Sequence, residues 1–342
     1  MSERAPRRPT MRDVGAHAGV SIKTVSRVVN GEATVAPELA ERVRLAIADL
    51  GYRPDQAASS LRRSDGRSRT IAVVLEDLAN PFSAALHRAV VDAARARGVL
   101  VLAASSDEDP VDERDAVAAF TARRVDGVVL MPTSAEHAWI DEERAAGTPI
   151  VMVDRPAGRD TDAVVSDNRE GATRATNHLL RRGHRRVAFL GDLAEIYTVR
   201  ERVAGYRAAL QAAGAPADDG LVRLDLRSSD AAQQAVVDLL AAPDPPTALF
   251  PSQNLVTIGA VRALRQLGLH QDVALVGFDD IVLAELLEPG VTVVAQDPAR
   301  IGRMAAERLL ARIDGDDAPT GLHVVPTRLI PRGSGEIPAP AG

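Results

Sequence analysis

The chain has 342 residues, which is long enough for two or three domains, and its 46% hydrophobic and 26% charged content is ordinary for a folded globular protein. Because it contains no cysteine, disulfides, thiolate metal sites and cysteine nucleophiles are excluded. No run approaches the roughly 18 apolar residues that a membrane span needs, and no apolar signal core follows the N-terminus. We therefore expect a cytoplasmic protein that has no membrane partner.

The net charge of −6 is unevenly distributed along the chain. Residues 1–69 hold 13 Lys and Arg against 8 Asp and Glu, a net charge of +5, which leaves −11 for the remaining 273 residues. Positive charge concentrated in a short segment favours binding to nucleic-acid phosphates. A solvated basic tail explains the same charge equally well, so sequence motifs are needed to decide between the two explanations.

Three short helices are predicted near the N-terminus. Thr10 and Asp13 have the spacing of a capping box and predict a helix over 11–18. A second helix over 22–29 and a third over 37–50 follow. A tight glycine-containing turn between the first two helices is the geometry that lets a recognition helix lie in the major groove of DNA.

The second helix has two distinct faces. Val25, Val28 and Val29 form its buried stripe, so the opposite side chains face outward. These outward residues are Ile22, Lys23, Ser26 and Arg27. The alternative role for Arg27 is a surface ion pair.

The stretch over 11–31 closely resembles the helix-turn-helix signature of the LacI/GalR repressor family, and the resemblance extends across essentially the whole remaining chain. It implies a homodimer that binds double-stranded operator DNA and is controlled by a small-molecule effector. The effector is expected to be a sugar or sugar derivative, with a purine or another signal as alternatives. No cofactor is implied.

The resemblance also implies roles for single residues in DNA binding. Ser21, Thr24 and Asn30 match positions that contact phosphates, whereas Ile22, Lys23 and Arg27 match positions that read base edges. The other expected DNA-binding residues are Thr10, Ser26, Tyr52, Ala58 and Leu61.

Residues 55–61 resemble the family's hinge helix, which folds when two copies meet on DNA. Leu61 matches the side chain that wedges into the minor groove. Asp55 stands where the family usually has Asn. Its carboxylate either weakens binding to phosphates or caps the hinge helix.

From Thr70 onward, continuous apolar runs alternate with amphipathic helical stretches. Such runs are typical of strands buried on both faces of a parallel sheet. They cover residues 71–75, 99–102, 127–131, 150–153, 186–190, 221–224, 248–250, 273–276 and 291–294. Nine units are too many for one compact sheet, so we predict an α/β fold of two doubly wound parallel-sheet lobes, which resembles periplasmic binding proteins.

These patterns divide the chain into three parts. Residues 1–54 form an all-α helix-turn-helix domain, residues 55–69 form the hinge helix and linker, and residues 70–342 form the two-lobed effector-binding and dimerisation domain. Within the last part, lobe 1 is expected at approximately 70–162 and 296–323, and lobe 2 at approximately 163–295 and 324–335. No leucine heptads follow, so a dimer is the default.

Ligands of open parallel sheets bind beyond the carboxyl ends of the strands. Polar residues follow the predicted strands at 76–82, 105–107, 154–155, 166–168, 252–254, 277–280 and 296–297. Any one of these loops could equally be a helix cap or a turn. The family resemblance implies that the effector is bound by Asn80, Asp154, Arg202, Gln253, Asp279 and Gln296, with Phe82 as an apolar wall.

Two further expectations concern the chemistry of this pocket. The neutral Asn254 stands where the family commonly has an acidic residue, which predicts a less acidic pocket. Aromatic residues make up only 3% of the chain, and Phe82, Tyr197 and Phe278 are the candidates for stacking on a sugar ring.

The competing class is a binding protein or an enzyme that shares the two-lobed fold. We find no nucleophile motif, no phosphate loop and no metal-ligand spacing. His178 and His184 are six residues apart at a helix end, a spacing that favours capping and packing over metal binding. The sequence therefore favours an effector-dependent repressor over an enzyme.

Overall fold

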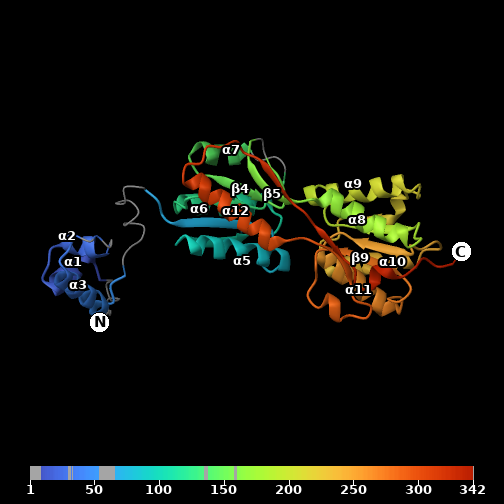
Figure 1. Cartoon of the computed structure of the whole chain (residues 1–342), viewed down its shortest axis with the longest axis horizontal. Helices are drawn as coiled ribbons and strands as arrows, with labels where there is room; N and C mark the ends of the chain where they lie inside the picture. Colours follow the sequence, from blue (N-terminus) through green and yellow to red (C-terminus); the bar gives the residue numbers. More distant parts are fainter. Residues whose placement is uncertain are drawn as a thin grey trace, which may run out of the picture. The chain divides into compact units, whose positions relative to one another are not determined.

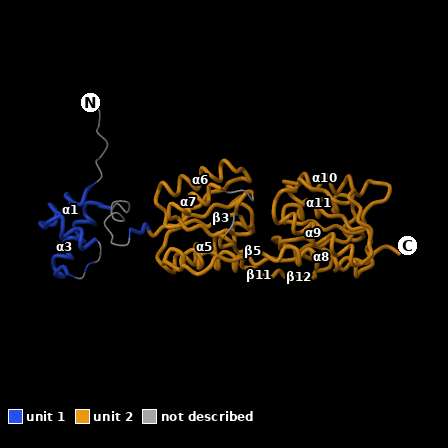
Figure 2. The backbone as a smooth tube through the Cα atoms, turned by 90° about the horizontal axis from the view of Figure 1, so that it is seen from above, with its two compact units in different colours: residues 1–68 blue, residues 69–342 orange. Residues whose placement is uncertain are grey.

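The computed structural model describes residues 9–29, 32, 34–53, 66–134, 138–157 and 160–341. The chain divides into two compact units, residues 1–68 and residues 69–342 (Figure 2). The predicted roles of Asn30, Asp55, Ala58 and Leu61 lie outside the described residues, as does the hinge helix expected over 55–61.

Unit 1 contains the three predicted helices, α1 (Met11–Ala18), α2 (Ile22–Val29) and α3 (Pro37–Leu50). The capping box is present, because the Thr10 hydroxyl accepts the Asp13 N–H and the Asp13 carboxylate accepts the Thr10 N–H at 2.7 Å. The helices enclose a small core of Val14, Ala18, Val25, Val43, Ala46 and Tyr52. Val28 and Val29 are only partly buried against it.

Unit 2 contains two six-stranded sheets, as predicted for two doubly wound lobes. The first sheet has the order β11-β5-β4-β3-β1-β2 and the second has the order β12-β10-β9-β8-β6-β7. All neighbouring strands are parallel except β10 and β12. The two sheets therefore repeat one topology, in which β1 corresponds to β6 and β4 corresponds to β9.

The strands of the first sheet are β1 (Thr70–Leu75), β2 (Leu100–Ser105), β3 (Val128–Leu130), β4 (Ile150–Val153), β5 (Asp162–Ser166) and β11 (Leu322–Val325). Those of the second are β6 (Val187–Leu190), β7 (Val222–Arg223), β8 (Ala248–Pro251), β9 (Ala274–Phe278), β10 (Thr292–Ala295) and β12 (Arg328–Ile330).

Helices cover both faces of each sheet (Figures 1 and 2). In the first lobe, α5 (Pro81–Ala96) and α12 (Pro298–Ile313) pack on one face, and α6 (Pro110–Ala122) and α7 (Ala138–Ala145) pack on the other. In the second lobe the pairs are α8 (Asn168–Arg181) with α9 (Tyr197–Ala212), and α10 (Ser229–Leu240) with α11 (Asn254–Leu267). Three short 3₁₀ helices lie at Asp219–Leu221, Ala284–Leu286 and Ser334–Glu336.

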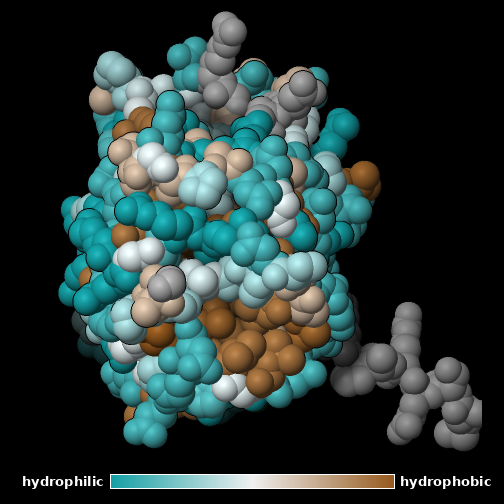
Figure 3. Space-filling view, turned by 90° about the vertical axis from the view of Figure 1, so that its right-hand side faces the viewer, coloured by the Kyte–Doolittle hydropathy of each residue, from teal (hydrophilic) through white to brown (hydrophobic). Residues whose placement is uncertain are grey.

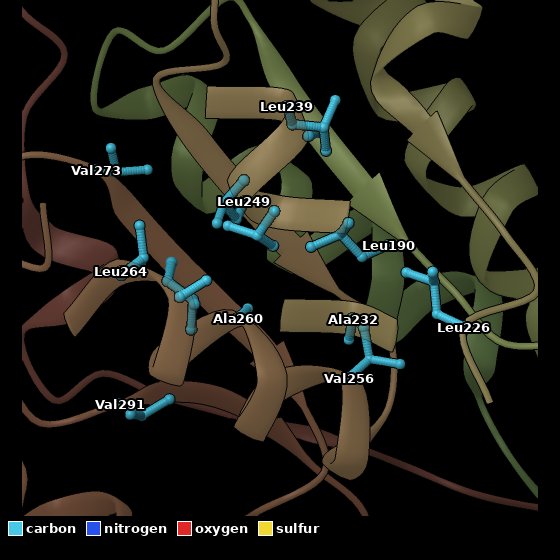
Figure 4. Packing of buried hydrophobic residues seen from close by; sticks show 14 of the residues in the cluster. Leu190, Leu226, Ala232, Leu239, Leu249, Val256, Ala260, Leu264, Val273 and Val291 are labelled. Carbon is cyan, nitrogen blue, oxygen red and sulfur yellow. The ribbon is translucent and has the colours of Figure 1, made fainter. Parts of the chain in front are cut away.

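The second lobe illustrates how this core is built (Figure 4). Leu190 and Leu249 project from the sheet onto α10 and α11, where they meet Ala232, Val256 and Ala260. All five side chains are fully buried. This dry layer fixes the helices against the sheet, so the loops at the strand ends are held in place.

The chain passes between the lobes three times, from β5 to α8, from β10 to α12 and from β11 to β12. The first sheet includes all of β5 and β11, so it extends a few residues past the approximate lobe ends at 162 and 323. Strands β5, β11 and β12 are not among the nine predicted runs. β11 and β12 are half-exposed edge strands, and β5 begins with Asp162, so none of them reads as a long apolar run.

None of the described helices is both long enough and apolar enough to cross a membrane.

Glycines allow the closest helix contacts in unit 2. A Cβ at Gly302 of α12 would lie 2.3 Å from the carbonyl oxygen of Leu86 in α5. Gly205 of α9 and Gly259 of α11 approach the backbone of their partner helices in the same way. A backbone oxygen cannot move aside as a flexible side chain can, so these contacts exclude larger residues.

We expect Gly302→Ala to lower the free energy of unfolding by about 1–3 kcal/mol, because α12 must shift away from α5. Chemical denaturation of the full chain measures the loss. The control is Gly321→Ala, whose added methyl group meets only a distant atom of His323 at 3.9 Å. Equal stability of the Gly302→Ala protein and the wild type would contradict this account of the helix contact.

Candidate functional site

A pocket lies where the carboxyl ends of the two sheets meet. Residues from both lobes line it, and the seven expected effector-binding residues are all among them: Asn80, Phe82, Asp154, Arg202, Gln253, Asp279 and Gln296. The remaining lining residues are Glu76, Arg155, Asp192, Ile196, Thr198, Val199 and Asn254. The structure thus brings together residues that are as much as 220 positions apart in the sequence, Glu76 and Gln296.

Helix caps position two of the polar residues. Asn80 caps α5 by accepting the N–H of Phe82 at 3.0 Å, and Gln253 caps α11 by accepting the N–H of Leu255 at 2.6 Å. The side-chain amide of Asn254 donates a 2.7 Å hydrogen bond to Oδ1 of the Asn80 side chain. Because both asparagines are buried, this bond joins the two lobes directly at the pocket.

Arg202 is held rigidly in the second lobe. Its Nε donates to Asn168 at 2.8 Å, its Nη1 donates to the carbonyl of Ser252 at 2.5 Å, and its guanidinium stacks 3.8 Å above the Phe278 ring. Nη2 makes no hydrogen bond to the described residues. Arg202 therefore has one donor group left for a ligand.

Arg155 serves the other lobe in a different way. It donates two hydrogen bonds, at 2.8 and 2.5 Å, to the carboxylate of Glu108. Its Nη2 lies 4.0 Å from Glu76 and its Nε lies 3.5 Å from Asp154. Because the bidentate pair with Glu108 uses most of its capacity, Arg155 only partly compensates the other two carboxylates.

Burial dominates the acid–base behaviour of the lining carboxylates. It raises the pKa of Glu76 to about 8, and nearby Arg155 opposes this rise while Glu108, Asp154 and Asp192 reinforce it. Burial also raises the pKa of Asp154, of Asp192 and of Asp279. All four groups are thus easier to protonate than ordinary carboxyls.

Although Asn254 is neutral, four acidic residues line the pocket, namely Glu76, Asp154, Asp192 and Asp279. One expectation from the sequence needs correction. Of the stacking candidates, Phe82 lines the pocket, but Tyr197 does not, and Phe278 is fully buried beneath Arg202. Their sequence positions next to pocket residues could not show which way the rings point.

The sequence assigns no effector-binding role to the other residues that line the pocket. Glu76, Arg155 and Asn254 lie in the strand-end loops that the sequence indicated. Asp192 was missed together with Ile196, Thr198 and Val199. The rule that ligand residues follow strand ends could have found Asp192, since it lies two residues after β6.

Polar contacts join the chain crossings beside the pocket. Gln296 donates to Asp279 at 2.6 Å and accepts a short hydrogen bond from Ser166. The Asp167 carboxylate accepts the N–H of Thr327 at 2.7 Å, and Arg174 donates to Asp167 at 3.0 Å. The pocket residue Gln296 is thus bonded to Ser166 at the end of β5, next to one of the chain crossings.

The predicted DNA-binding side chains of unit 1 differ in their exposure. Ser21, Ile22 and Lys23 are exposed, and the exposed fraction of Ile22 is 44%. Thr10, Thr24, Ser26 and Arg27 are half-buried, whereas only 8% of Tyr52 is exposed. The hydroxyls of Ser21 and Thr24 are 3.0 Å apart.

The surface ion pair considered for Arg27 is present, since its Nε lies 3.5 Å from the Glu32 carboxylate. Both side chains are more than 40% exposed. Exposed pairs of this kind contribute about 0–1 kcal/mol, so Arg27 can exchange this partner at little cost.

The two histidines make structural contacts. His178 Nε2 lies 2.7 Å from the Glu336 carboxylate, and the ring nitrogens of His184 lie 2.9 Å from the Thr247 hydroxyl and from the Ile337 carbonyl. Within the ranges that the structure describes, no group of three or more His, Cys, Asp or Glu side chains could hold a metal ion.

Sequence comparisons now identify the family. Residues 10–55 match the family described as "Bacterial regulatory proteins, lacI family", and residues 176–335 match the "Periplasmic binding protein-like domain". The HTH-type transcriptional regulator PtxS of Pseudomonas aeruginosa is 35% identical over 96% of this chain and 96% of its own length. The chain belongs to the lacI family.

Solved structures of lacI-family regulators have the same fold. A "transcriptional regulator CelR-cellobiose complex" is 35% identical with a TM-score of 0.71, and the match covers 96% of this chain and all of that one. A lac repressor dimer bound to operator and the anti-inducer ONPF is 26% identical with a TM-score of 0.86, over 96% and 99% of the two chains. This lacI-family chain is therefore a DNA-binding transcription regulator, and the enzyme alternative is set aside.

The raised pKa of Glu76 makes stability depend on pH. The folded chain keeps a proton on Glu76 that the unfolded chain releases above the ordinary carboxyl pKa. Stability from this group is thus fully present below about pH 4.5 and is lost as the pH rises through about 8. Thermal unfolding from about pH 5 to pH 8.5 should show a steeper decline for the wild type than for Glu76→Gln, which cannot ionise. Parallel curves would refute the assignment.

Proposed function

We propose that this chain is a repressor that binds a near-palindromic operator as a dimer and responds to a small effector, a sugar or sugar derivative, between its lobes. The main support is the pocket, because seven residues expected from the family to bind the effector converge there from both lobes. Their side chains supply hydrogen-bonding groups around an apolar wall, which suits a polyhydroxylated ring.

The small volume of the pocket suggests how an effector could act. In this conformation the pocket has a cavity volume of only about 50 Å³, which is small for a site that takes a sugar. Entry therefore requires the side chains or the lobes to move apart. An effector that binds one lobe arrangement more tightly shifts the population toward it, which is the coupling that regulation requires.

Unit 1 provides the DNA-binding surface in this proposal. Lys23 and Arg27 on α2 would read base edges together with Ile22, and the hydroxyls of Ser21 and Thr24 would contact phosphates. Thr10, Ser26 and Tyr52 are proposed as supporting contacts. The core beneath α2 fixes these side chains on a rigid helix, which suits a recognition surface.

A second copy of the chain would complete the DNA-binding protein. Val282, Leu283 and Leu286 form one exposed apolar segment between β9 and β10, with 76%, 61% and 72% of their surface accessible. Figure 3 shows the face at the end of the second lobe, where a larger patch of apolar residues lies in the lower half of the view. Exposed apolar surface of this kind is typical of interfaces. The related lac repressor structure is described as a dimer.

We expect sedimentation velocity to give twice the chain mass of 36.2 kDa at micromolar concentration. Val282→Asp with Leu286→Asp places charge in the exposed apolar segment and should shift the chain toward monomer. The matched control is Leu322→Asp, which charges an apolar side chain of similar exposure on β11. A wild-type monomer at all concentrations would rule out the dimer.

The DNA-binding proposal predicts that Arg27→Ala weakens specific binding by about 1–3 kcal/mol, or roughly 5- to 150-fold, with little loss on unrelated DNA. A gel-shift titration on the protein's own promoter region, repeated across a salt series, measures both values. Arg44→Ala is the control, since it removes the same charge from an exposed arginine on α3. If both variants lose the same affinity, α2 does not read the bases.

A further inference from the structure

The two lobes place carboxylates at equivalent strand ends. Glu76 follows β1 and Asp192 follows the corresponding strand β6. Asp154 follows β4 directly, and Asp279 directly follows the corresponding strand β9. Because the carboxyl ends of both sheets meet at the pocket, the repeated topology produces two pairs of acidic groups, with one member of each pair from each lobe.

The second pair is equivalent down to its backbone. Asp154 and Asp279 both have left-handed conformations, with φ of 65° and 70°. The N–H of Asp154 donates to Val164 and that of Asp279 donates to Val294, both at 2.9 Å. A non-glycine residue in this region is strained, and such strain gathers where a side chain must be aimed at a ligand.

Protein donors only partly satisfy these carboxylates. Asp192 accepts from Gln253 at 3.1 Å and from the Leu193 N–H at 2.7 Å, and Asp279 accepts from Gln296 at 2.6 Å. Asp154 is 94% buried and lines the pocket. Its carboxylate accepts no hydrogen bond from the described residues, and its ion pair with Arg155 Nε, at 3.5 Å, is too long to give either group a hydrogen bond. The only cationic group near the Glu76 carboxylate among the described residues is Arg155, whose Nη2 lies 4.0 Å away.

The cations do not balance the acids. Four carboxylates line the pocket beside two arginines, and Arg155 is already held by a fifth carboxylate, Glu108. Arg202 has a single donor group left. The free hydrogen-bonding capacity that faces a ligand is therefore dominated by carboxyl oxygens, and ionising these groups together in the pocket would place like charges close to one another.

We propose that the effector of this pocket is a polyol that carries a protonated amine, and that the pocket discriminates against sugar acids and sugar phosphates. The inference rests on the proposed function, since it names the chemical class for the same effector site. The ammonium would lie among Glu76, Asp154, Asp192 and Asp279, where it supplies donors to Glu76 and Asp154 and to the remaining acceptor positions of Asp192 and Asp279. The apolar sides of Phe82, Ile196 and Val199 would face the C–H surface of the ring.

The test compares matched probes on the full chain by isothermal titration and thermal shift at about pH 6.5, where hexosamines are protonated. Glucosamine, galactosamine and mannosamine are each compared with the parent hexose and with the corresponding hexuronate. In every configuration that binds, we expect the amine to bind about tenfold more tightly than the parent sugar, the ratio typical of a charge-assisted over a neutral hydrogen bond. The hexuronate should bind most weakly.

Variants separate charge recognition from general pocket damage. Glu76→Gln and Asp192→Asn should each lower the affinity of the amine more than that of the parent sugar, so the ratio of the two affinities should fall. Asp230→Asn, which removes a carboxylate 82% exposed on α10, should change neither value. If the pocket variants fail to fold, the order of affinities of the three kinds of probe for the wild type still tests the proposal.

Proton release gives a second readout. Titrations in two buffers of different ionisation enthalpy should show that the amine displaces a proton from the pocket, whereas the parent sugar displaces none. A hexuronate that binds as tightly as the amine would overturn this inference and leave effector control by a sugar intact. A response to Mg²⁺ alone that matches the amine would also overturn it. If no probe binds, the sugar-like effector proposed above fails as well.

Discussion

The central constraint on unit 2 is that two parallel sheets of the same strand order meet at their carboxyl ends. Several polar side chains that follow strands at this junction, Asp154 and Asp279 among them, are buried and need partners there. The lobes solve this by pairing amides with carboxylates, as in Gln253 with Asp192 and Gln296 with Asp279. Asp154, which has only Arg155 Nε at 3.5 Å, is the group that a bound ligand would satisfy best.

The arginines show that the pocket is built from within each lobe. Arg202 is fixed by Asn168, Ser252 and the Phe278 ring, all in the second lobe. Arg155 is fixed by Glu108 in the first lobe. Each cation is therefore pre-organised before the lobes approach, and the contact between lobes is left to weaker neutral bonds such as that between Asn254 and Asn80. Such a junction can open without breaking a buried ion pair.

Local signals explain which parts of the structure the sequence could predict. The helices of unit 1 follow from caps and helical spacing, so their ends coincide with the predicted ones. The strand-end rule found most of the pocket, because it depends on topology alone. It could not orient Phe278 or Tyr197, which depends on packing against Arg202 and neighbouring helices. It placed Glu76, Asp154 and Asp279 at strand ends but missed Asp192, whose position opposite Glu76 follows from the equivalence of β1 and β6.

The acidic groups at equivalent strand ends affect how easily the two lobes close. A carboxylate from one lobe meets a carboxylate from the other, so closure without a ligand is opposed by repulsion, or else requires a proton, which the raised pKa of Glu76 accommodates. A bound ligand that is rich in hydrogen-bond donors would replace the proton on Glu76 and remove the repulsion that opposes closure of the lobes. The free-energy difference between open and closed lobes is then set largely at the pocket, beside the Gln296 and Asp167 contacts that join the chain crossings. Electrostatic balance between the lobes would thus couple effector binding to the arrangement of the lobes.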